Sequence, residues 1–504
     1  MRECLRRICD EIWIVDLGGE GRGTRQDENV FDIQTPVAIA LAVRYGDYDP
    51  NTPARAHYCR LEGTRKAKLE RLESLAALDD LRFEDCPTDW QAPLRPRSAS
   101  AFFAWPKLTE LLPWQSSGVQ VKRTWPIGPT RAVLEARWQA LLHAADRAAA
   151  FRQTRDRKLD SVVTDLDTGE RLPSLSDLTA DAPAPSIRPY GYRSFDRQWL
   201  LADARLVDYP RPALWQSHSG VQLYFASLFS QPLSSGPSLT ISTAVPDLDF
   251  FRGSFGAKNI LPLYRDAQAR QPNLHPALLS TLSRALGREV GAQDFAAYLY
   301  AALAHPGYTD RFRNELENRM LHVPVTLDTT LFEQAVTLGR RLIYLHSYGE
   351  RLQQGQTWPQ GAARCTRAVA PDGLPERFDY DAASRILKVG QGRFEPVAPA
   401  VWQFEVSGLK VVQSWLGYRL RNRKGKKSSP LDDIAPEGWS SAFTTELLRL
   451  LALLEETLRL YPRQDALLAD ILHGPLLEAE ALGPAPEEYR QPPTVHESQR
   501  QLEI

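Results

Sequence analysis

The sequence predicts a mixed α/β and α+β fold. Two largely apolar runs, 12–17 and 37–43, stand near the start with little polar alternation, which is typical of strands buried on both faces of a helix-covered sheet. Further on, strand-like pieces precede and follow a long helical stretch at 274–352. Only 11 residues precede the first apolar run. We therefore expect an incomplete sheet first and an α+β region with a helical section after it.

The first third of the chain contains both strands and helices. Residues 10–45 are predicted to form strand, loop and strand, and 54–77 strand, turn and helix. A helix is expected from Thr130, a plausible N-cap, to about Arg155. Its apolar face would hold Leu134, Trp138, Leu141, Leu142 and Ala145. The segment 176–189 is rich in Pro, Asp, Ser and Ala, which indicates a boundary.

Beyond this boundary, 221–229 and 238–245 are predicted strands, 362–412 holds short strands, and 415–473 is helical. The apolar segment 446–461 is interrupted by charges, so it is expected to be an amphipathic or buried helix and not a membrane span. These patterns predict four parts: 1–125, a connecting helix and linker at 126–180, a main region at 181–490, and a disordered tail at 491–504.

The composition excludes some classes of protein. With 61 Lys and Arg against 62 Asp and Glu, no overall positive field draws the chain to nucleic acid or membrane. Five scattered cysteines without paired metal-ligand spacing fit a reducing cytoplasm and predict no structural metal. The glycine-rich stretch 16–23 lacks the spacing of a nucleotide-binding loop.

No self-sufficient catalytic site is visible. The sequence holds neither a G-x-S-x-G nucleophile elbow nor a kinase signature. Adjacent carboxylates such as Asp432 and Asp433 are expected at a helix start or a solvated turn.

One run of positive charge, at 418–429, is a local excess. It is either a solvated loop or a loop that contacts phosphates, and the residues alone leave both readings open. Thinner clusters elsewhere mix cations with aromatic residues, a combination that suits both phosphate contact with base stacking and ordinary anchored loops. The candidate DNA contacts in the run are Arg419, Arg421, Arg423, Lys424, Lys426 and Lys427, and those in the thinner clusters are Arg193, Arg197, Lys258, Lys122 and Trp114.

Several segments, taken in order, resemble a known family. Residues 10–44 resemble the last strands of the methyltransferase domain in large adenine-N6 DNA methyltransferases of restriction-modification and phage-defence systems. Residues 190–203, 261–266, 296–316 and 407–419 resemble the C-terminal specificity region of Type ISP restriction-modification enzymes. In one departure, His322 stands where relatives often carry an arginine.

The resemblance implies DNA target recognition, with double-stranded DNA as partner and a cytoplasmic location. The family's S-adenosylmethionine-binding loop and its [DNS]-P-P-[YFW] motif, which positions a flipped adenine, do not occur. We therefore expect no catalytic or cofactor-binding residue in this chain, and S-adenosylmethionine only where a separate catalytic subunit supplies that half. Three readings remain: a recognition part of a split or truncated enzyme, a non-catalytic scaffold or binding subunit of a defence complex, and an independent enzyme.

Overall fold

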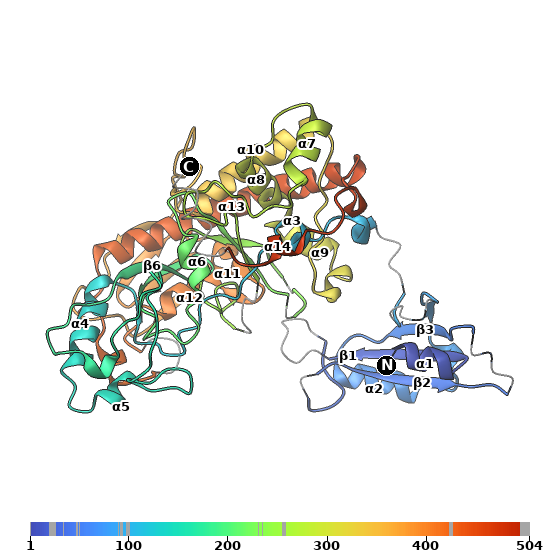
Figure 1. The fold of residues 1–504 in the computed structure, drawn as a ribbon, viewed down its shortest axis with the longest axis horizontal. Coiled ribbons are helices and arrows are strands. Elements are labelled where there is room, and N and C mark those ends of the chain that lie inside the picture. Colours follow the sequence, from blue (N-terminus) through green and yellow to red (C-terminus); the bar gives the residue numbers. More distant parts are fainter. Residues whose placement is uncertain are drawn as a thin grey trace. The chain divides into compact units, whose positions relative to one another are not determined.

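A computed structural model describes residues 2–19, 27–33, 35–46, 49, 51–88, 90, 94–96, 101–229, 231–233, 235–254, 259–422 and 427–493. The chain divides into two compact units, Met1–Ala101 and Phe102–Ile504, drawn in Figure 1. Residues 20–23 of the glycine-rich stretch and 494–504 of the predicted disordered tail fall outside the described residues.

The first unit is a four-stranded sheet with the strand order β2-β1-β3-β4. Strand β1 pairs antiparallel with β2 and parallel with β3. Lys68 on α2 is buried, and its ammonium group bonds the Leu17 carbonyl at 2.6 Å, which ties the helix to the end of β1. The elements are α1 (Arg2–Ile8), β1 (Glu11–Gly18), β2 (Val37–Val43), β3 (Arg55–Arg60), α2 (Arg65–Glu73) and β4 (Glu84–Asp85).

The expectation that both apolar runs are buried on both faces is wrong for the second run. Strand β1 lies inside the sheet, and its Ile12 is buried. Strand β2 lies at the edge of the sheet, where Ile39 and Leu41 are 40% and 41% exposed. No strand among the described residues pairs with the outer edge of β2, so the sheet is open on that side. The opposite edge is the two-residue acidic strand β4, a short charged edge of the kind that discourages further pairing.

The second unit combines several small sheets with a helical section. The sheets have the orders β5-β7-β6, β10-β8-β9, β11-β14-β13-β12 and β15-β16. The strands are β5 (Ile127–Gly128), β6 (Ile187–Arg193), β7 (Asp196–Leu201), β8 (Tyr224–Ser227), β9 (Thr240–Ser242), β10 (Asn259–Pro262), β11 (Arg364–Arg367), β12 (Phe378–Asp381), β13 (Ile386–Val389), β14 (Gly392–Glu395), β15 (Glu405–Val406) and β16 (Leu409–Lys410).

Helices α8, α10 and α13 pack against one another and form the centre of the helical section (Figure 1). Every residue of α8 from Phe295 to Leu303 is buried, so this helix is enclosed on all sides. The helices of the unit are α3 (Leu108–Leu111), α4 (Arg131–Leu142), α5 (Arg147–Phe151), α6 (Pro212–Gln216), α7 (Leu278–Leu286), α8 (Ala292–Leu303), α9 (Pro306–Arg311), α10 (Thr329–His346), α11 (Pro399–Gln403), α12 (Val411–Gly417), α13 (Ser441–His473) and α14 (Glu487–Arg490). No helix among the described residues is long and apolar enough to cross a membrane.

The helix predicted from Thr130 begins as expected but is shorter. The Thr130 side chain accepts a hydrogen bond from the Val133 N–H, and the predicted apolar face is buried at Leu134 and Trp138. The helix ends at Leu142, because Asp146 caps a second helix, α5, instead of continuing the first. Together with residues from β6, β7 and Leu431, these two helices form a separate small apolar cluster.

Candidate nucleic-acid interface

The tight turn between β6 and β7 carries two of the predicted cations. Arg193 ends β6, is 7% exposed and bonds the Asp247 carboxylate at 2.7 Å. Tyr190 donates to the same carboxylate at 2.7 Å, and the Arg193 guanidinium lies 4.0 Å from the Tyr192 ring centroid. Burial acts to lower the pKa of Arg193, but Asp247, Tyr192, Tyr418 and Asp249 together outweigh it and raise that pKa. Arg193 is thus a fixed interior cation.

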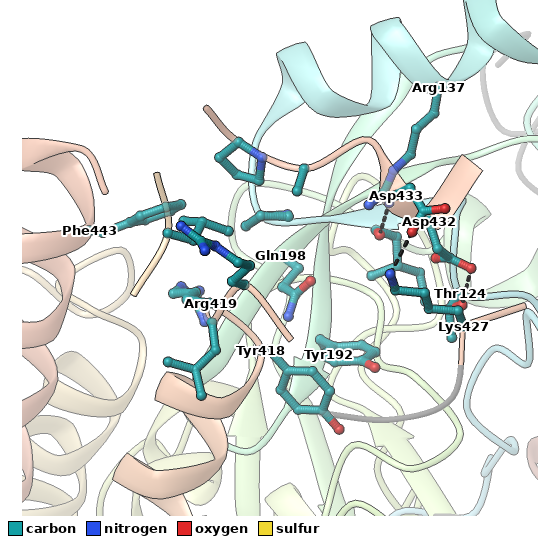
Figure 2. A pocket seen from close by; sticks show the side chains of 17 residues that line it. Thr124, Arg137, Tyr192, Gln198, Tyr418, Arg419, Lys427, Asp432, Asp433 and Phe443 are labelled. Atoms are coloured by element: carbon teal, nitrogen blue, oxygen red, sulfur yellow. Dashed lines mark hydrogen bonds and ion pairs between the residues drawn. The ribbon is translucent and has the colours of Figure 1, made fainter. Parts of the chain in front are cut away.

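Arg419 completes this arrangement from far along the chain. It follows α12, is 1% exposed and bonds Asp196, the first residue of β7, at 2.9 Å. Its guanidinium lies 3.8 Å from the Trp415 ring centroid and donates to the Trp415 carbonyl at 3.0 Å. Figure 2 shows Arg419 near Gln198 of β7 and Phe443 of α13. Burial also raises the pKa of the neighbouring Glu446, against the opposing effect of Arg419.

The cations that follow Arg419 differ from it in exposure. The Arg421 side chain is 58% exposed and pairs with Glu376 at 2.9 Å. The Lys427 side chain is 52% exposed and pairs with Asp433. Such pairs on the surface are weak, so either cation can exchange its carboxylate for a phosphate at little cost. The remaining cations of the run, Arg423, Lys424 and Lys426, lie outside the described residues.

The end of the run is held by Asp432. This carboxylate accepts hydrogen bonds from the Thr124 hydroxyl at 2.8 Å and from the Ser428 N–H at 2.7 Å. Ser429 and Asp432 form a capping box at the start of a short 3-10 helix. The expectation that Asp432 and Asp433 mark a helix start is therefore confirmed. The link from Asp432 to Thr124 is not readable from the sequence, because it joins residues far apart in the chain.

A small pocket lies between these segments, and Figure 2 shows the side chains that line it. Its volume of about 50 Å³ leaves room for a few water molecules but not for a nucleotide. Arg137, which sequence reasoning missed, enters it from α4 and donates to the Ile127 carbonyl at 2.8 Å and the Ile434 carbonyl at 2.8 Å. The pocket has a structural role: it lies where several segments meet, and the charges of its cations and carboxylates neutralise one another. No group of three or more His, Cys, Asp or Glu side chains in the described residues could hold a metal ion.

The other predicted contacts are distributed more widely. Arg197 pairs with Glu350 and lies 4.2 Å from the Tyr348 ring centroid, and its side chain is 35% exposed. Lys122 pairs with Asp156, and its side chain is 32% exposed. Trp114 is 1% exposed, and its backbone is bonded by Asn273. Lys258 lies outside the described residues.

The structure therefore brings only some of the predicted DNA-contacting residues close together. It brings the segments of residues 122–125, 192–198 and 418–433 together. Trp114, Arg193 and Arg419 need correction as candidate DNA contacts, because each is buried by its own packing or ion pair. A nucleic acid can reach Arg421 and Lys427 most readily, and Arg197 and Lys122 in part.

His322, the departure from the family pattern, has an interior role. It is 5% exposed, and its Nδ1 lies 2.7 Å from the Trp105 carbonyl oxygen. Burial lowers its pKa, which favours the neutral imidazole. His322 is therefore placed to hold the start of the second unit together, and not to contact a base or a phosphate.

Comparison with known proteins agrees with this architecture. Three solved structures share the fold: a DrdV–DNA complex (16% identity, TM-score 0.58), a nuclease-deletion mutant of the Type ISP restriction-modification enzyme LlaGI in complex with a DNA substrate mimic (15%, 0.59), and the ATP-dependent Type ISP restriction-modification enzyme LlaBIII bound to DNA (16%, 0.62). They cover 91%, 92% and 95% of this chain, whereas this chain covers 47%, 37% and 32% of theirs.

The chain thus spans less than half the length of each of these proteins. No curated protein sequence matches it. The family model of the Type ISP C-terminal specificity domain matches residues 110–450, which is more than half of the chain and lies entirely in the second unit. The chain therefore belongs to the Type ISP C-terminal specificity domain family.

Proposed function

We propose that this chain recognises the DNA target of an adenine-N6 DNA methyltransferase in a restriction-modification or phage-defence system. The observation that carries the proposal is the specificity-domain match over residues 110–450. The three similar structures are described as DNA complexes, which supports DNA as the partner. In this proposal the second unit, Phe102–Ile504, forms the recognition region, and the first unit, Met1–Ala101, is the methyltransferase-like part.

In this proposal the exposed cations near the end of α12 contact the phosphates of the DNA. Arg421 and Lys427 flank the stretch that holds Arg423, Lys424 and Lys426, so five cations fall within seven residues. Cations of this kind release counterions when they contact phosphates, which makes binding strongly dependent on salt. The buried Arg419 has a structural role, because its ion pair with Asp196 anchors the start of the positively charged run to β7.

The first unit is proposed to be the far edge of a methyltransferase sheet, with the catalytic half outside this chain. Strand β2 supports this. Its apolar sequence is typical of a strand buried on both faces, yet it lies at the edge of the sheet with its side chains exposed. S-adenosylmethionine would bind only to the missing half. Calorimetry of the chain with S-adenosylmethionine should therefore give no heat of binding, and a tight 1:1 complex would contradict the assignment.

A salt titration tests DNA recognition. The test variant replaces Arg421, Arg423, Lys424, Lys426 and Lys427 with Ala and keeps Arg419. The control variant removes the same charge elsewhere by replacing Lys66, Arg155, Arg284, Arg313 and Arg459, all exposed. Affinity for a DNA duplex is measured against salt concentration. Each lost phosphate contact should flatten the log–log slope by about 0.9 in the test variant only.

Two results would count against the proposal. Equal slopes for the wild type, the test variant and the control would show that the run is a solvated loop. No binding by the wild type at low salt would leave the non-catalytic scaffold subunit as the better account.

A further inference from the structure

A second hollow adjoins the small pocket of Figure 2, and Tyr418 and Leu420 line both. Its volume is about 610 Å³, which is within the range of ligand-binding pockets and is large enough for a nucleotide. Four segments form its walls: the turn at 252–254, Phe378 of β12, the β15–β16 hairpin, and α12 with the residues that follow it. None of these segments was predicted to recognise individual bases.

The described residues that line this hollow include no carboxylate. Arg252 and Lys410 contribute positive charge, and the remaining polar side chains are amides and hydroxyls. In contrast, Asp432 and Asp433 line the small pocket. A lining of this kind suits an anionic ligand, because no like charge within it repels the ligand.

Two glycines of the lining have left-handed backbone conformations. At Gly253 a Cβ would lie 3.3 Å from Leu409 and 3.6 Å from Arg193, and the backbone φ is +80°. Gly408 has a φ of +89° in the hairpin turn. Both positions therefore favour glycine for the turn itself. The rim cation Lys410 is held by Glu405 of the paired strand at 2.5 Å.

The two amides of the lining are placed for recognition. Gln413 is on α12, whose Val411, Val412 and Trp415 are buried and fix the helix, while Gln413 itself is partly exposed. Asn422 is exposed at the other end of the hollow. Neither amide makes a hydrogen bond with any other described residue, so neither is needed to hold the fold.

A buried hydroxyl beside Gln413 points to the same conclusion. Ser414 lines the hollow, is 2% exposed, and its Oγ has no hydrogen-bond partner. A buried polar atom without a partner costs about 1–3 kcal/mol, so such atoms are rare in proteins unless a ligand or water satisfies them. The hollow thus presents a donor and acceptor set that the chain itself leaves unused.

Resting on the proposed DNA recognition, we propose that this hollow reads a base of the DNA target and that Gln413 and Asn422 determine its specificity. A side-chain amide offers one donor and one acceptor side by side, which matches the N6 and N7 edge of adenine in the major groove. Amides can also bond phosphates, but only contacts to base edges carry sequence information, so the test below measures sequence preference. Arg252 and Lys410 would then face the backbone on either side of the base that is read.

Selection from a random DNA library tests this assignment with the full chain. The test variant is Gln413→Ala with Asn422→Ala. The control is Gln268→Ala with Asn314→Ala, two exposed amides that do not line the hollow. The wild type and the control should enrich the same motif. The test variant should lose about five- to a hundredfold of discrimination at one or two positions of that motif. Its salt slope and its melting temperature should match those of the wild type, since amides neutralise no phosphate.

The outcomes separate the two proposals. If the wild type enriches a motif and the test variant enriches it equally well, base readout by this hollow is overturned. The same holds if the wild type binds duplexes without any preference. If the wild type does not bind DNA at low salt, the proposed function fails, and the base-reading assignment fails with it.

Discussion

The two units of the chain bury apolar side chains in opposite ways. In the second unit, α8 is enclosed on all sides, and a single core cluster extends across most of the unit. In the first unit, β2 is a strand of seven apolar residues that lies at an open edge. The first pattern is that of a unit whose apolar side chains are buried by its own residues. The second is that of a sheet with an exposed apolar edge strand.

The comparison extends to charge. The second unit places some of its arginines inside, each with a specific carboxylate, as Arg419 has Asp196 and Arg123 has Asp208. Others, such as Arg421, stay on the surface. Interior pairs determine where segments meet, whereas surface cations remain available to a ligand. A single run of positive charge in the sequence therefore contains residues with two different functions.

The largest expected effect comes from breaking an interior pair. Arg419→Met leaves Asp196, whose side chain is 2% exposed, without its partner and should lower the free energy of unfolding of the second unit by about 3–5 kcal/mol. The control is Arg421→Met, two residues away, whose exposed pair should contribute no more than about 1 kcal/mol. Urea unfolding followed by tryptophan fluorescence measures both. Equal losses of unfolding free energy in the two variants would show that burial does not distinguish a structural arginine from a surface arginine.

Acid should weaken the second unit through its buried histidines. Burial lowers the pKa of His346 to about 3 and that of His305 to about 4. The unfolded chain takes up these protons near pH 6.5, so this contribution to stability is complete above pH 6.5 and is lost as the pH falls toward 3. At pH 5 each histidine should cost roughly 2 kcal/mol.

Urea titrations at several pH values measure this dependence. His346→Gln should flatten it, whereas His473→Gln, at an exposed position at the end of α13, should not. An unfolding free energy that is independent of pH between 5 and 7 would contradict the assignment of a buried neutral His346.

The smallest effect is expected at the open edge of the first unit. Ile39→Lys with Leu41→Lys should change the stability of that unit by no more than about 0.5 kcal/mol, because both side chains are already partly in water. The same substitutions should reduce concentration-dependent self-association, measured by sedimentation. Ile12→Lys, on the neighbouring interior strand, is the control and should unfold the unit. A large loss of stability from the β2 variant would show that its edge is not open.

Local patterns in the sequence were enough to predict many elements of the fold. The Thr130 cap, the buried face around Trp138 and the helical nature of 274–352 follow from short-range periodicity. The edge position of β2 could not be predicted, because an apolar strand has the same sequence whether or not its neighbour is present. The burial of Arg419 could not be predicted either, since its partner Asp196 is 223 residues away.

Hydrogen exchange of the full chain with and without a DNA duplex tests the central claim most directly. We predict slower exchange on DNA addition in the peptides that cover 252–254, 408–422 and 427–433, where the carboxylate-free hollow and the exposed cations lie. Strand β2 and the rest of the first unit should exchange as before. Unchanged exchange in all three peptides at a DNA concentration well above the dissociation constant, or protection confined to the first unit, would contradict the assignment of DNA recognition to this surface.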